Sequence, residues 1–223
     1  MRQSLNPLGT LLPAALLGLA ACSGSVQVTP EPALPRALVQ PLPARVGLVL
    51  DSGLRGYRHE ETRYGSGWAV NLGPGHVKMM ESMFGASFGG VARFDSVDEA
   101  QAATGLQAIF VPGIEQFSFA TARDTSGGYW ATTIRYRIAV LAPDGTPADA
   151  LTLTGYGSAR EDGGKGASLT HATIAAMRDA AAKFLVQLPR QGLATPLKAG
   201  EVVKVGKDIA LAVDAIEVVP IEP

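Results

Sequence analysis

The stretch from Tyr129 to Leu141 alternates apolar and polar side chains more regularly than any other part of the chain. One set of positions is apolar (Trp130, Ile134, Tyr136, Ile138 and Val140), and the other carries Thr133, Arg135 and Arg137. Successive side chains of a strand point to opposite faces of a sheet. The pattern therefore predicts a strand in a sheet that is covered on one face and wet on the other.

Other strands are expected around this one. Pro143-Asp144-Gly145 has the residue types of a turn, so Ala150 to Ala159 should pair with the first strand as an antiparallel hairpin. Apolar, β-branched content also predicts strands over Arg45 to Asp51 and Gln107 to Thr121. In the latter, Pro112-Gly113 is expected to mark a bulge or break. Shorter strands are expected at Trp68 to Leu72, Val91 to Asp95, Glu201 to Val205 and Ile209 to Ile221.

Two segments change to a helical period. Residues 74–90 place Val77, Met80, Phe84 and Phe88 near helical spacing, with Pro74 in the first turn and Gly89-Gly90 at the end. This apolar face is expected to be core, with a binding groove as the alternative. A second helix is expected over Leu169 to Leu188 after an N-cap at Ser168, and Ala172, Ala176 and Ala180 would let it approach a sheet closely. The fold class predicted is α+β, a mostly antiparallel sheet with two helices packed on one face.

The amino terminus has the parts of a secretory signal. Arg2 supplies a positive charge, Leu8 to Ala20 is apolar, and the small residues Ala20 and Ala21 precede the only cysteine of the chain. The apolar run is interrupted by Pro13 and is shorter than the roughly 20 residues that a transmembrane helix needs. We expect residues 1–21 to be a signal peptide.

Leu19-Ala20-Ala21-Cys22 resembles the lipobox of bacterial lipoproteins at all four positions. The resemblance implies diacylglycerol on the Cys22 sulfur, cleavage before Cys22 and acylation of the new amino terminus. Cysteine suits this role because its thiolate is a strong nucleophile. The alternative is an ordinary signal peptide that leaves a free thiol. Because Ser23 rather than Asp follows the cysteine, the resemblance implies an outer-membrane anchor, with the protein facing the periplasm.

Five prolines lie between Ser23 and Ala44. Proline at this density favours extended polyproline geometry. Residues 22–44 are therefore expected to be the lipidated cysteine and a Pro-rich linker, a semi-rigid spacer reaching at most about 60 Å at ~3.1 Å per residue. The alternative is that apolar residues within it dock onto a partner. Residues 45–190 are the expected globular domain, and 191–223 a C-terminal β-hairpin or appendage.

The charge and the cysteine content of the chain limit its possible partners and cross-links. The formal net charge is −1 and no basic patch is evident, so a nucleic-acid partner is not expected. With Cys22 modified, no cysteine is left for a disulfide, and the domain must be held by core packing alone.

The order of predicted elements resembles that of small bacterial lipoproteins of the YajG and LptE-like kind. It also resembles the amino-terminal domain of TolB and the auxiliary lipoproteins of ABC-type export systems. The residues that carry the resemblance are RVGLVLD at Arg45, VARFD at Val91, the Pro143-Asp144-Gly145 turn and the helix that begins near His171. The resemblance implies a non-enzymatic helper of envelope assembly or transport, and it supplies no functional residues.

Catalytic and metal signatures are weak. His59, His76 and His171 have no second ligand at metal-binding spacing. Gly163-Gly164-Lys165-Gly166 lacks the Ser or Thr that follows the lysine of a phosphate-binding loop, and the G-x-S-x-G motif of serine hydrolases does not occur. We therefore expect no enzyme activity, no metal and no cofactor.

The segment between Gly53 and Gly75 is rich in residue types that are enriched in interfaces. The candidate partner-binding residues are Arg55, Tyr57, Arg58, Tyr64 and Trp68. The alternative is a long hairpin with a solvated tip.

The function expected is a membrane-anchored interaction, assembly or transport-auxiliary module of the Gram-negative envelope. Its partners would be the membrane, through the acyl chains, and a protein of the envelope. An alternative is a carrier of a lipid or other apolar ligand between helix 74–90 and the sheet. A hydrolase is the third alternative.

Overall fold

The computed structural model describes residues 25–33 and 39–204. Cys22 and the predicted strand Ile209 to Ile221 lie outside these residues. The strands are β1 (Val26–Val28), β2 (Leu42–Val49), β3 (Arg58–Arg63), β4 (Ser66–Asn71), β5 (Phe88–Phe94), β6 (Ala108–Ala120), β7 (Tyr129–Leu141) and β8 (Pro147–Arg160). The helices are α1 (Ser52–Arg55), α2 (Gly73–Ser87), α3 (Val97–Ala102), α4 (Ala122–Thr125), α5 (Lys165–Gln187) and α6 (Ala194–Lys198), with a 3-10 turn at Leu188–Arg190.

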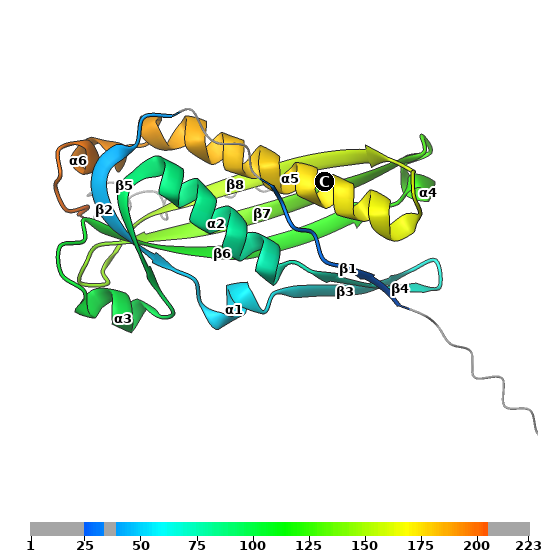
Figure 1. The fold of residues 1–223 in the computed structure, drawn as a ribbon, viewed down its shortest axis with the longest axis horizontal. Helices are drawn as coiled ribbons and strands as arrows, with labels where there is room; N and C mark the ends of the chain where they lie inside the picture. The colour runs from blue at the N-terminus through cyan, green and yellow to red at the C-terminus, as the bar shows by residue number, and fades with distance from the viewer. Residues whose placement is uncertain (1–24, 34–38, 205–223) are drawn as a thin grey trace, which may run out of the picture.

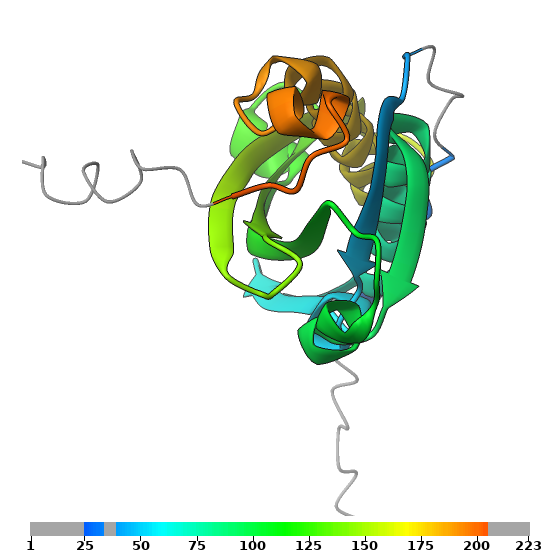
Figure 2. The ribbon, with the colours of Figure 1, turned by 90° about the vertical axis from the view of Figure 1, so that its left-hand side faces the viewer.

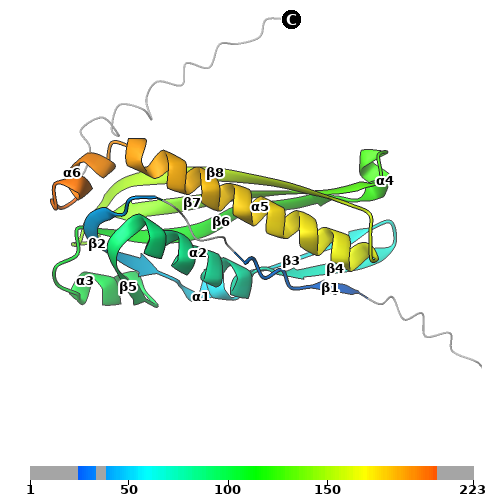
Figure 3. The same cartoon turned by 45° about the horizontal axis from the view of Figure 1, so that its top comes forward.

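Two sheets organise these elements. The larger has the order β5-β2-β6-β7-β8, and the smaller has the order β1-β4-β3. Pairing is antiparallel through β6, β7 and β8 but parallel between β2 and its neighbours β5 and β6. The α+β class is confirmed, with sheets that are mixed rather than purely antiparallel. Helices α2 and α5 lie side by side across one face of the larger sheet, as expected (Figure 3).

Strand β7 has the predicted two-faced character. Trp130, Ile134, Tyr136, Ile138 and Val140 are all buried, whereas Arg135 and Arg137 are exposed. Helix α5 covers the buried face through Ala172, Ala176 and Ala180. The facing positions on β8 are Gly155 and Gly157, and a Cβ on either would lie 2.1 Å from a carbonyl oxygen of α5. Small residues on both elements therefore let the helix backbone lie directly on the strand.

The apolar face of α2 is core, as predicted. Met79, Met80, Met83 and Phe84 are buried, and Val77 is half-buried. The Phe84 ring packs against the rings of three other phenylalanines at centroid distances of 5.1–5.7 Å (Phe88, Phe110 and Phe184).

The predicted end of this helix was wrong by a few residues. The helix stops at Ser87, and Gly89-Gly90 lie inside β5. Strand β5 pairs in parallel with β2, with Gly90 opposite Arg45. This tertiary pairing outweighs the local tendency of two glycines to form a turn.

The predicted spacer differs most from the structure. Val26–Val28 form β1, which pairs with β4, and the side chains of Val28, Pro30 and Pro32 are buried. Strand β2 already begins at Leu42, a buried residue. The apolar residues between the prolines account for this docking, because their burial favours packing on the domain over extension into water.

Three smaller predictions were also wrong. Helix α5 begins at Lys165, because the Ser168 hydroxyl bonds back to Asp162 (2.9–3.0 Å) from within the first turn instead of capping the helix. The β6 register shift falls between Ile114 and Gln116, not at Pro112-Gly113. Residues 201–204 are not a strand, although the Val203 side chain is buried and its amide donates to the Gln107 carbonyl at 2.9 Å.

The molecule has two distinct ends (Figure 1). At one end lie the β3–β4 turn (Tyr64-Gly65), α4 and the connection from Arg160 to Lys165, which we call the hairpin pole. At the other end lie α3, α6 and the β7–β8 turn, and this end faces the viewer in Figure 2. The start of β1 is at the hairpin pole, because β1 runs parallel to β4 and β4 starts at the β3–β4 turn.

The helix–strand contact predicts opposite effects for two Gly-to-Ala substitutions. Gly155→Ala should destabilise the domain by about 2–3 kcal/mol, because the new methyl group overlaps the Ala176 carbonyl. Gly85→Ala, in α2 with nothing within 4 Å of the new Cβ, should stabilise it by about 0.5–1 kcal/mol. Urea unfolding of wild type and both variants measures these changes in the free energy of unfolding. A Gly155→Ala protein as stable as wild type would contradict the close packing.

Candidate functional site

A cleft of about 420 Å³ opens at the hairpin pole. It lies between the β3–β4 hairpin, α4 and the amino-terminal end of α5, so it joins three segments that are far apart in the sequence. We call it the pole cleft. Its lining residues are Arg63, Tyr64, Ser66, Trp68, Thr121, Ala122, Arg123, Gly128, Trp130, Glu161 and Lys165.

The two tryptophans of the chain form the apolar part of this lining. Trp68 and Trp130 are 3% and 2% exposed, and their ring centroids are 5.2 Å apart. Phe119 packs against both rings. Within the described residues, neither indole N–H has a hydrogen-bond partner. Buried polar groups are nearly always paired, so these two donors are the unsatisfied groups of the cleft.

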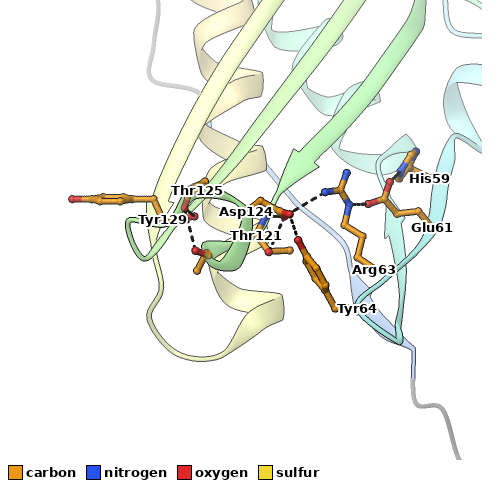
Figure 4. Close-up of polar contacts among 9 residues, drawn as sticks. His59, Glu61, Arg63, Tyr64, Thr121, Asp124, Thr125 and Tyr129 are labelled. Atoms are coloured by element: carbon orange, nitrogen blue, oxygen red, sulfur yellow. Dashed lines mark hydrogen bonds and ion pairs between the residues drawn. The ribbon is translucent and has the colours of Figure 1, made fainter.

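Polar side chains connect the rim of the cleft across the two sheets (Figure 4). The Tyr64 hydroxyl donates to Asp124, and the Arg63 guanidinium lies 3.3 Å from the same carboxylate. Asp124 also accepts from the amide and the hydroxyl of Thr121, at 2.7 and 2.8 Å. The Arg123 guanidinium lies over the Tyr64 ring, 4.3 Å from its centroid. The hairpin tip is thereby fastened to α4.

Hydrogen bonds set the charge state of Asp124. Donation by Tyr64 and then by Thr121 lowers the pKa of this carboxyl to about 2. The depressed pKa means that the charged carboxylate, and the contacts it makes, persist down to that pH and are lost as the pH falls through it. The rim is therefore intact at neutral and mildly acidic pH.

The structure separates the five predicted partner-binding residues. Tyr64 and Trp68 line the pole cleft, Tyr64 as an exposed rim residue and Trp68 as a buried one. Arg55 and Arg58 lie outside it, and pair with Asp95 and Glu60 respectively. Tyr57 is half-buried against the core, and burial raises the pKa of its hydroxyl. The alternative prediction was a long hairpin with a solvated tip. Strands β3 and β4 do form a hairpin, but Tyr64 at its tip bonds to Asp124 of α4.

The cleft and its rim also contain residues that the sequence did not point to as interface residues. Thr121, Arg123 and Asp124 follow β6, and Glu161 and Lys165 follow β8. The available signal was the strand order, since the β6–β7 and β8–α5 connections must lie at the same end of an antiparallel hairpin. Which sheet edge the β3–β4 hairpin approaches is not encoded in that order.

The histidines have separate surroundings. His171 is exposed on α5, and His59 lies 3.1 Å from Glu61 with its ring against Phe117. His76 is fully buried in α2, with Nδ1 2.7 Å from the Leu72 carbonyl and Nε2 2.7 Å from the Tyr136 hydroxyl. A carbonyl only accepts, so Nδ1–H donates to Leu72 and Nε2 accepts from Tyr136. His76 is thus a structural, neutral imidazole.

Burial lowers the pKa of His76 from 6.5 to about 4. In the unfolded chain His76 therefore becomes protonated near pH 6.5, whereas in the folded chain it stays neutral down to about pH 4. This contribution to stability is complete above pH 6.5 and falls by about 3 kcal/mol as the pH drops to 4. Urea unfolding should show this loss in wild type and a flatter pH dependence in His76→Gln. Equal slopes in the two proteins would contradict the assignment.

Neither a metal-binding cluster nor a membrane-spanning helix is found in the part of the chain that the structure describes. No cluster of three or more His, Cys, Asp or Glu side chains is arranged to hold a metal ion there. No helix in residues 25–33 and 39–204 is long and apolar enough to cross a membrane.

No protein-family model and no curated protein matches the chain. Among solved structures, it is similar to a Xanthomonas campestris protein of the DUF330 family, with 16% identity and a TM-score of 0.44 over 72% of this chain and 90% of the other. It is also similar to a protein from Caulobacter crescentus CB15 described as a candidate lipoprotein. There the identity is 12% and the TM-score 0.36, over 55% of this chain and 82% of the other.

Proposed function

We propose that the protein is a lipoprotein of the Gram-negative envelope, acylated at Cys22 and held at the outer membrane facing the periplasm. Its domain acts as a non-enzymatic binding module in assembly or transport. The observation that carries the proposal is the signal-like sequence of residues 1–21 followed by Cys22, with the motif Leu19-Ala20-Ala21-Cys22. Several acyl chains on one cysteine would give stable anchoring, where a single chain gives marginal binding.

The position of β1 agrees with this role. Strand β1 begins at Val26, four residues after Cys22. A mature protein that starts at Cys22 would therefore enter its folded domain almost at once. The domain is then presented close to the membrane instead of at the end of a long spacer.

The residues of the pole cleft favour binding over catalysis. Its lining combines two tryptophans, a tyrosine and three cationic side chains, residue types that are common at the centre of binding sites. The hydrolase alternative required two or three histidines and a carboxylate to converge. His76 instead bonds to Leu72 and Tyr136 inside the core.

The carrier alternative required space beneath α2. Met80 and Phe84 are fully buried there, and the Phe84 ring is surrounded by other phenylalanine rings. This packing fills the region in which an apolar ligand would lie, so the described residues of α2 do not favour the carrier.

Acylation is tested by metabolic labelling. In cells given labelled palmitate, the wild-type protein should carry label and sediment with the outer membrane. Cys22→Ser should carry no label and should remain as an unprocessed precursor or leave the membrane fraction. Ser23→Ala is the matched control and should behave as wild type. A wild-type protein without label would refute the proposed anchor.

The role as a module is tested by crosslinking in cells. A photoreactive amino acid placed at exposed Arg123, at the hairpin pole, or at exposed Asp98, in α3, should capture a discrete envelope protein from at least one position. The capture should disappear in the Cys22→Ser background, because the module acts only when anchored. Failure to capture any protein from both positions would count against a protein partner.

A further inference from the structure

The chain between the proposed anchor and the domain is very short. Three Cα-to-Cα steps separate Cys22 from Ser25, the first described residue, and they span at most about 11 Å. Whatever path these residues take, the acylated Cys22 must therefore lie near Ser25. The place where β1 enters the domain consequently decides which side of the molecule lies next to the membrane.

That place is the hairpin pole. In the parallel pairing of β1 with β4, Val26 is opposite Trp68, and Ser25 lies against Gly67, whose Cβ position would be 3.4 Å from the Ser25 Cβ. Strand β1 runs away from the pole, so Ser25, just before its start, lies on the side of the β3–β4 turn. Figure 1 shows this turn, α4 and the beginning of α5 at the same end.

The side chains at this end suit the surface of a bilayer. Tyr64 and Tyr129 lie at the hairpin pole and are 56% and 41% exposed, whereas Trp68 and Trp130 are buried behind them. Tryptophan and tyrosine favour the interface between lipid and water, because their rings are apolar and their N–H or O–H groups are polar.

Two cations on the rim of the pole cleft are available to a ligand. Arg123 and Lys165 are exposed, and neither forms an ion pair with another residue in the described ranges. Arg63 is not available in the same way, because Glu61 and Asp124 both pair with it. Glu161 is the carboxylate among the lining residues, and the Asp124 carboxylate pairs with Arg63. Arg123 and Lys165 are thus the two cations of the lining that a phosphate group could pair with.

We propose that the hairpin pole rests on the membrane that holds the anchor, and that the pole cleft takes the phosphate of a phospholipid headgroup against Arg123 and Lys165. The inference rests on the proposed acylation of Cys22. A guanidinium and an ammonium bind a phosphodiester through charge-assisted hydrogen bonds. The rings of Trp68 and Trp130 form the adjoining apolar wall, against which the glycerol part of the lipid would lie. The end with α3 and α6 then points away from the membrane, toward a protein partner.

The orientation is tested on the full, acylated protein in phosphatidylethanolamine–phosphatidylglycerol vesicles. Cys22 is the only cysteine, so an introduced cysteine is the only free thiol. Thr62→Cys, beside the hairpin tip, and Asp98→Cys, in α3, each take a fluorescent label. A nitroxide on the lipid headgroup should quench the label at position 62 several-fold more than the label at position 98. Equal quenching, or stronger quenching at position 98, would overturn the proposed orientation.

The headgroup site is tested through the intrinsic fluorescence of Trp68 and Trp130, which both line the pole cleft. The acylated protein in detergent is titrated with dihexanoylphosphatidylethanolamine. Wild type should show a saturable change in emission, and Arg123→Gln/Lys165→Gln should require at least a tenfold higher lipid concentration. Arg160→Gln is the matched control, because Arg160 lies over Tyr129 at the same pole but does not line the cleft.

Each remaining outcome overturns the headgroup site. No saturable change in wild type, or an unchanged response in the double variant, would refute it. An equal response to inorganic phosphate would show a site for a free anion instead of a lipid. Failure of the function proposed above is distinguishable, since it appears as absence of palmitate on Cys22. An acylated protein with an unquenched label at position 62 would keep the lipoprotein function and refute only the orientation.

Discussion

The close contact between α5 and β8 is the interaction on which the rest of the structure depends. Gly155 and Gly157 have no side chain, and Ala172 and Ala176 have small ones, so the helix lies directly on the strand. This contact covers the apolar face of β7, and it places the beginning of α5 at the hairpin pole. Without a disulfide in the described residues, dense packing of this kind must hold the domain together.

The docking of β1 gives the amino terminus a structural role. A Pro-rich segment of this length could hold a domain far from its anchor. Here Val28, Pro30 and Pro32 are buried on the domain, and the residues left between Cys22 and Ser25 are few. The same segment that would lead from the proposed anchor also completes the smaller sheet, so acylation of Cys22 would couple attachment to orientation. A signal peptide and a lipobox alone carry no such information.

The pole cleft joins residues whose neighbours in sequence give no hint of a common site. Tyr64 and Trp68 were predicted as interface residues, but Arg55 and Arg58 have local ion-pair partners, and Tyr57 packs on the core. The group that fastens Tyr64 is Asp124, sixty residues later in the chain. Residue type alone predicted an interface segment, while tertiary contacts selected which of its members lie in the cleft.

The sequence by itself determined the α+β class, the β7–β8 hairpin and the apolar faces of α2 and α5, because each is written in a local period of two or 3.6 residues. It also determined the motif at Cys22. Only the tertiary structure decided that Val26–Val28 form a strand, and that β5 begins as early as Phe88 and pairs in parallel with β2. It also decided that the β3–β4 tip bonds to α4 and that His76 is buried against Tyr136. The physical reason is that a parallel pairing or a buried hydrogen bond joins residues that are distant in sequence. Its free energy therefore depends on the whole arrangement and not on a local pattern.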